Sequence, residues 1–216
     1  MRLRLAPGLH GAMIEGDLVL LDVAADAYFC LPAAARDLVL SGSELEVTPA
    51  ALAEGLCEVG LALPLVAGLG DARPTPPPPT RTARRLIETL DAASRTRPCH
   101  GLALTKAVAA AIAGRRLAFE ALLPAAVPFA VQPPTPALLS DLAVYRRIVP
   151  WLPIDGACLF RSHMLRAYLT TLGHGVSWVF GVRTWPFSAH CWLQAGDVAL
   201  DDEAERLTAY APILVL

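Results

Sequence analysis

One stretch near the C-terminal end, PFSAHCWLQAGDVALDD (residues 186–202), concentrates side chains that can do chemistry. It places His190 beside Cys191 and ends in Asp201 and Asp202. A carboxylate on one ring nitrogen holds an imidazole in one tautomer, and the imidazole can then exchange protons with a nucleophile. The stretch is therefore compatible with a catalytic histidine, a metal site, or an ordinary hairpin that carries reactive side chains.

Cys158 could supply the nucleophile that such a histidine needs. The run ACLFRSHMLRAYLTTLG predicts a helix that ends at Gly173, and it places Cys158 in the first turn. The positive end of the helix dipole favours a thiolate there. A cysteine near a helix start is also typical of small core residues. The residue types alone leave both interpretations open.

The spacing after His190 predicts two strands joined by a two-residue turn at 196–197. Folding the chain about that turn sets His190 and Asp202 side by side. Because side chains alternate along a strand, Asp201 and Cys191 are expected to point to the opposite face. The pattern therefore favours Asp202 as the carboxylate that orients His190, and it makes Cys191 a core residue facing away from the chemistry.

A zinc site is the main alternative to a catalytic site for these side chains. Structural zinc sites favour pairs such as C-x-x-C or H-x-x-x-H, whose spacing lets two ligands converge on one ion. No such pair occurs in the sequence, and the adjacent residues His190 and Cys191 would diverge on a strand. We therefore do not expect a structural zinc ion, and hydrolysis through a cysteine thioester needs no metal or nucleotide cofactor.

The segment DARPTPPPPT predicts a boundary at residues 71–80. Consecutive prolines remove backbone donors and fix φ, which excludes a helix interior or a central strand and favours a semi-rigid spacer. The sequence thus predicts a small domain over residues 1–70, a proline-rich linker over 71–80 and a larger domain over 81–216.

The small domain begins with short β-favouring runs, HGAMIEG, DLVLLDV and AYFCL, which predict a three-stranded meander. Helices are expected over 32–42 and over 49–59, since each begins near a proline and stops at a glycine. In the larger domain, helices are expected over 81–94, 101–113, 140–148 and 158–172, followed by strands in 176–202. The fold class is therefore α+β in both parts.

Composition excludes several functional classes. Hydrophobic residues make up 55% of the chain and charged residues 18%, values typical of a globular protein rather than a disordered one. The net charge of −2 gives no basic surplus for nucleic acid. Apolar windows are interrupted before they reach the roughly 20 residues of a membrane span. The five scattered cysteines and the lack of a signal-peptide pattern predict a cytoplasmic protein.

The C-terminal part resembles the lasso peptide biosynthesis B proteins, which are transglutaminase-like cysteine proteases. The similarity lies in CLFRSHMLRAYLTTLG, WVFGVRTWPFSAHCWLQ, VALDD and the closing YAPILVL. The resemblance implies a transglutaminase- or papain-like α+β domain in which Cys158 is the nucleophile, His190 the general base and acid, and Asp202 the orienting residue. The family often carries Asn at the position of Asp201.

The N-terminal part resembles the small PqqD-like domain, a leader-recognition element with a winged-helix-like arrangement of a three-stranded sheet and helices. The similar segments are GDLVLLDVAADAYFCL and LCEVGLAL. The resemblance implies that a leader peptide adds as a strand beside the third strand, which would make these residues peptide-binding: Ala27, Tyr28, Phe29, Cys30 and Leu31. A plain structural meander with core aromatics is the alternative.

Together the two resemblances imply a protease that binds the leader of a ribosomally made lasso precursor and cuts it at the leader–core junction. The freed core would pass to a separate asparagine-synthetase-like cyclase, an implied partner. Two alternatives use the same residues differently: an acyltransferase or transglutaminase, in which an amine resolves the thioester, and a leader-binding adaptor in which Cys158 is only structural.

Overall fold

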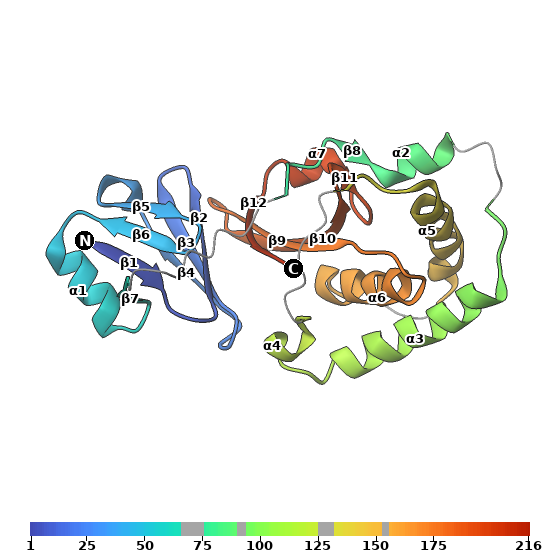
Figure 1. Ribbon diagram of the computed structural model, residues 1–216, viewed down its shortest axis with the longest axis horizontal. Helices are drawn as coiled ribbons and strands as arrows, with labels where there is room; N and C mark the ends of the chain where they lie inside the picture. Colours follow the sequence, from blue (N-terminus) through green and yellow to red (C-terminus); the bar gives the residue numbers. More distant parts are fainter. Residues whose placement is uncertain (66–75, 90–93, 125–131, 153–155) are drawn as a thin grey trace. The chain divides into compact units, whose positions relative to one another are not determined.

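The computed structural model describes residues 1–65, 76–89, 94–124, 132–152 and 156–216 (Figure 1). The chain divides into two compact units. Unit 1 comprises Met1–Thr75, Gly181–Ser188 and Ala211–Leu214, and unit 2 comprises Pro76–Phe180, Ala189–Tyr210 and Val215–Leu216. Half of the expected linker lies outside the described residues, so the domain boundaries at 70 and 81 stay predictions. The predicted α+β class is confirmed.

Unit 1 contains the predicted three-stranded meander. Strands β2 (Leu9–Ile14), β3 (Asp17–Asp22) and β4 (Ala27–Leu31) pair antiparallel in the order β2-β3-β4. The central strand β3 is buried on both faces from Leu18 to Leu21, as its continuous apolar run predicts. Strand β4 is half-exposed and lies at the edge of this sheet.

A second sheet in unit 1 was not predicted. Its order is β5-β6-β1-β7, formed by β1 (Arg2–Leu5), β5 (Leu38–Ser41), β6 (Glu44–Val47) and β7 (Ala62–Pro64). Helix α1 (Ala50–Glu58) confirms the helix expected over 49–59. The helix expected over 32–42 is wrong. Only a 3₁₀ turn forms at Ala34–Arg36, after which β5 pairs antiparallel with β6.

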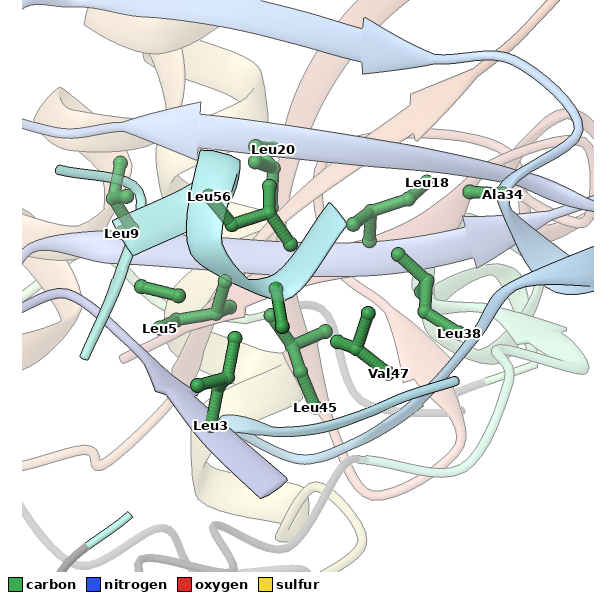
Figure 2. Close-up of a cluster of buried hydrophobic side chains, with 12 residues drawn as sticks. Leu3, Leu5, Leu9, Leu18, Leu20, Ala34, Leu38, Leu45, Val47 and Leu56 are labelled. Carbon is green, nitrogen blue, oxygen red and sulfur yellow. The ribbon is translucent and has the colours of Figure 1, made fainter. Parts of the chain in front are cut away.

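One hydrophobic core joins the two sheets and α1 (Figure 2). Its leucines come from strands on both sheets, and Leu56 closes the cluster from α1. Burying such side chains contributes about 1.5–3 kcal/mol each. Pairing with β6 lets β5 bury Leu38 in this core, which accounts for a strand where local sequence favours a helix.

Unit 2 carries most of the helices. Their bounds are α2 (Ala83–Glu88), α3 (Pro98–Gly114), α4 (Phe119–Leu122), α5 (Pro136–Ile148), the 3₁₀ turn Val149–Trp151, α6 (Cys158–Thr171) and α7 (Ala204–Leu207). The helices expected over 101–113, 140–148 and 158–172 are confirmed. The helix expected over 81–94 is confirmed only for α2, since a two-residue strand forms at Arg81–Thr82. Residues 90–93 of that prediction lie outside the described residues.

A five-stranded sheet has the order β12-β9-β10-β11-β8. Its strands are β8 (Arg81–Thr82), β9 (Ser177–Arg183), β10 (Ser188–Ala195), β11 (Val198–Ala199) and β12 (Ala211–Val215). Strands β10 and β11 pair antiparallel as predicted, whereas β8 pairs parallel with β11. Helix α6 packs along α3 (Figure 1). Among the described helices, none has the length and apolar character that crossing a bilayer requires.

Candidate active site

Helix α6 places the Cys158 thiol at its N-terminal end. Cys158 is the first residue of the helix and is half-buried. The following turns are fixed in the core by Leu165, Tyr168 and Leu169, all of which are nearly or fully buried. The predicted first-turn position of Cys158 is therefore confirmed, and the rigid helix holds the sulfur near backbone N–H groups that favour an anion.

The β10–β11 hairpin positions the histidine and the carboxylate. Ala195 pairs with Val198, which leaves 196–197 as the predicted two-residue turn, and Gly196 has a φ of 56°. Such a turn favours a residue that tolerates positive φ. The Asp197 carboxylate accepts hydrogen bonds from Arg81 at 2.6 and 2.9 Å, which ties the turn to β8.

His190 and Asp202 lie in direct contact. His190 Nε2 is 2.6 Å from Asp202 Oδ2, and their side chains are 18% and 13% exposed. Rings of Trp192 and Tyr210 flank the imidazole, with centroids 6.3 and 5.5 Å away. Asp202 Oδ1 also accepts from the Glu203 backbone N–H at 2.7 Å. The carboxylate is therefore held in place while it binds one ring nitrogen.

The second partner of His190 is Cys158. Hydrogen bonds from the side chains of Cys191 and His190 lower the pKa of the Cys158 thiol to about 4, although burial opposes this effect. The hydrogen bond to Cys158, with a further one to Asp202, raises the pKa of His190. Near neutral pH these directions favour a thiolate beside an imidazolium. Because Asp202 occupies Nε2, Nδ1 is the ring nitrogen left for the sulfur.

The prediction that Cys191 faces away from the chemistry is wrong. Both its side chain and its backbone hydrogen-bond Cys158. Its own thiol is 4% exposed, and the bond to Cys158 together with burial raises its pKa, so Cys191 remains protonated. Alternation along a strand sets the face of a side chain, but it does not exclude contact with a residue that meets the strand from a helix end.

Asp201 and Asp202 diverge as predicted, but strand alternation is not the reason, because β11 ends at Ala199 and both aspartates lie in the bend that follows it. Asp201 accepts hydrogen bonds from Ser162 Oγ at 2.7 Å and from the Leu193 backbone N–H at 2.8 Å. Burial raises the pKa of Asp201 to about 6, although both hydrogen bonds oppose the rise. Ser162 lies one helical turn after Cys158 on the same face of α6. Asp201 thus fastens this face of the helix to β10, whereas Asp202 serves His190.

A second histidine–aspartate cluster lies elsewhere in unit 2. Asp141 on α5 accepts hydrogen bonds from His100 Nε2 at 3.0 Å, His174 Nε2 at 2.9 Å and Arg97 at 2.8 Å. Burial alone would raise the pKa of Asp141, but these partners hold it below its usual value. Tyr168 Oη donates to the Asp141 carbonyl at 3.2 Å. The cluster joins α3, α5 and the end of α6.

In a comparison with known families, residues 116–215 match the model of the transglutaminase-like superfamily. Residues 116–215 are therefore similar to transglutaminase-like domains. Domains of this superfamily are of the cysteine protease and acyltransferase type. The matched residues include Cys158, His190 and Asp202. Searches among curated proteins and among solved structures found no match.

The five residues predicted to bind peptide all lie on β4 and so share one edge strand of unit 1. Phe29 is 44% exposed and Cys30 is also exposed, whereas the other three are half-buried. Tyr28 packs on Phe187 with ring centroids 5.4 Å apart. Their role in binding stays a prediction.

Sequence reasoning missed the contributions of Ser162 and Cys191 to the site. The helical spacing of Ser162 from Cys158 was the available signal, because it puts the two side chains on one face. No comparable signal joins Cys191 to Cys158. Within the described ranges, no group of three or more His, Cys, Asp or Glu side chains has an arrangement that could hold a metal ion.

Proposed function

We propose that the chain is a cysteine peptidase that removes the leader from a ribosomally made precursor peptide. The observation that supports it most is the continuous contact from Cys158 through His190 to Asp202. Each neighbour suits its role: a thiolate at a helix start, an imidazole with one nitrogen held by a carboxylate, and partial exposure to solvent.

In the acylation step, the Cys158 thiolate attacks the carbonyl carbon of the scissile peptide bond. The C–N bond breaks as protonated His190 delivers its Nδ1 proton to the leaving amine, which frees the core peptide with a new N-terminus. The leader remains attached to Cys158 as a thioester. The Asp202 carboxylate stabilises the imidazolium and holds the ring so that Nδ1 faces the sulfur.

In the second step, neutral His190 takes a proton from water, and the resulting hydroxide attacks the thioester. The C–S bond breaks, the leader leaves as a carboxylic acid, and Cys158 returns to the thiolate beside protonated His190. An amine in place of water would give an amide instead. An acyltransferase would therefore be recognised by an amine-joined product.

Leader capture is proposed at the exposed edge of β4. An extended peptide can add to an edge strand through backbone hydrogen bonds, while side-chain pockets give sequence preference. The exposed Phe29 ring offers an apolar contact to such a strand. Capture of the leader would raise the local concentration of the scissile bond to the millimolar order typical of short linkers.

The resemblance to lasso peptide B proteins supports the substrate class and the cyclase partner. It leads to a first check on the gene's surroundings: a short precursor reading frame and a gene for an asparagine-synthetase-like cyclase should lie beside it. That precursor is the substrate for the tests below.

The cleavage test mixes the full-length chain with the synthetic precursor and follows the products by mass spectrometry. The wild type should give leader and core, whereas Cys158→Ala should give neither and still bind the precursor. Cys99→Ala is the matched control, because Cys99 is an exposed cysteine at the N-terminal end of α3. Cleavage by Cys158→Ala at the wild-type rate would remove the peptidase proposal, and the adaptor alternative would stand if neither the wild type nor Cys99→Ala cleaves.

The binding test uses fluorescence polarisation of a labelled leader with the full-length Cys158→Ala chain. Adding Phe29→Glu should weaken binding about tenfold or more, since it puts a charge at the centre of the proposed apolar contact. Val39→Glu is the matched control, because Val39 is 62% exposed on the edge strand of the other sheet in unit 1. Equal effects of the two changes would argue against capture at β4.

A further inference from the structure

The proposed peptidase steps leave Cys191 without a reacting role, although its thiol contacts the nucleophile. The Cys191 side chain hydrogen-bonds the Cys158 side chain. Cys191 Sγ also lies 3.9 Å from Ser162 Oγ. Because Ser162 is one turn beyond Cys158 on the same face of α6, the two contacts place the Cys191 sulfur against the helix face that carries Cys158.

The two thiols differ in access and in charge. Cys158 is half-buried and has a pKa of about 4, so it is a thiolate that a small oxidant can reach. Cys191 is 4% exposed, and both the Cys158 contact and burial raise its pKa. Oxidation should therefore begin at Cys158, and Cys191 is positioned to react with the oxidised sulfur.

We propose that Cys158 and Cys191 are a redox modification site, at which hydrogen peroxide converts the two thiols into a reversible disulfide. The Cys158 thiolate attacks a peroxide oxygen, the O–O bond breaks, and the departing hydroxide takes a proton to become water. Cys158 is then a sulfenic acid. The Cys191 sulfur attacks the Cys158 sulfur, the S–O bond breaks, and a second water leaves. Two thiols lose two electrons and two protons, and one peroxide becomes two waters.

Oxidation of Cys158 also removes one cause of the raised pKa of Cys191. The thiolate of Cys158 is one cause of the raised pKa of Cys191, and conversion to a neutral sulfenic acid removes its charge. The disulfide would silence the proposed nucleophile while preventing its further oxidation to sulfinic acid, which thiols cannot reverse. The inactivation depends on the proposed peptidase function, but the formation of the bond does not.

The test exposes the reduced full-length chain to hydrogen peroxide at pH 7, blocks free thiols with N-ethylmaleimide, and maps tryptic peptides by mass spectrometry. Cys158 lies in peptide 148–161 and Cys191 in peptide 184–206, and neither peptide contains another cysteine. The expected product is a cross-link between these peptides that dithiothreitol reverses. Sulfinic acid at Cys158 without a cross-link would overturn the proposal.

Three variants make the result specific. In Cys191→Ala and in the better volume match Cys191→Ser, the fraction of Cys158 that dithiothreitol restores should fall at least about tenfold, because irreversible acids accumulate. Cys99→Ala should form the cross-link as the wild type does. Full recovery in both Cys191 variants would contradict the proposal. A chain that forms the cross-link but cleaves no precursor would refute the peptidase function and leave the redox pair standing.

Discussion

Two clusters in unit 2 join histidine to aspartate, and they differ in what surrounds the ring. His190 binds Asp202 through Nε2, keeps 18% of its side chain exposed, and has a thiol as its other partner. His100 is 1% exposed, and both of its ring nitrogens have non-reacting partners: Asp141 at Nε2 and the Arg97 backbone N–H at Nδ1. A histidine–aspartate pair thus suits catalysis only where one nitrogen faces a nucleophile that substrate can reach.

The largest expected effect is on activity, and it separates the two aspartates. Asp202→Ala should lower kcat/KM for precursor cleavage by about 10³-fold or more, because His190 loses its orientation and the stabilisation of its charge. Asp141→Ala should leave the activity per folded molecule within about threefold of wild type, since Asp141 contacts neither Cys158 nor His190. Equal losses in the two variants would contradict the division of roles.

The free energy of unfolding should show the reverse order, with a larger loss in Asp141→Ala than in Asp202→Ala. Asp141→Ala leaves two histidines and an arginine without their shared, 6% exposed carboxylate, and we expect a loss of about 4 kcal/mol in the free energy of unfolding. Asp202→Ala should lose about 1 kcal/mol, because water can reach its partners. Urea denaturation of both variants at pH 7 measures the difference. A larger loss in Asp202→Ala would mean that the His190 pair is the structural one.

The sequence predicts the His190 cluster better than the Asp141 cluster, and the physical reason is locality. A two-residue turn returns the chain beside β10 and so brings Asp202 near His190, while helix periodicity places Cys158 at a helix start. His100, Asp141 and His174 come from three distant segments, and only tertiary packing brings them together. The missed strand β5 is a different case, because it pairs with β6 across a two-residue turn at 42–43. There the alanine-rich approach and Gly42 resemble a helix and its end, and the burial of Leu38 in a core drawn from distant strands favours the strand instead.

Asp201 is a third aspartate, and it shows how burial changes the pKa of a carboxyl that has no histidine partner. Its pKa of about 6 in the folded chain exceeds the ordinary value of 3.8, so the folded state binds more protons between about pH 4 and pH 6. Its contribution to stability therefore falls as the pH rises through this window, by about 3 kcal/mol for a two-unit shift. Asp201→Asn should remove this fall.

Urea denaturation of the wild type and of Asp201→Asn at a series of pH values gives the difference curve. Subtracting one from the other cancels the other titrating groups. A difference that stays constant from pH 4 to pH 6 would show that Asp201 titrates as an exposed carboxyl does. Activity at pH 7 should change far less than in Asp202→Ala, because Asp201 binds Ser162 and the β10 backbone rather than the imidazole.

The smallest expected effect concerns the feature that distinguishes the His190 cluster, its charged thiol. The rate of Cys158 alkylation by iodoacetamide should rise with pH around the thiol pKa of about 4 and change little from pH 6 to pH 7. Cys191→Ala removes the hydrogen bond that lowers this pKa most, so the midpoint should move to higher pH and the rate at pH 5 should fall by about threefold or more. Asp141→Ala should leave the curve in place, since the Asp141 cluster does not contact Cys158. A midpoint that stays the same in Cys191→Ala but shifts in Asp141→Ala would contradict the comparison between the two clusters.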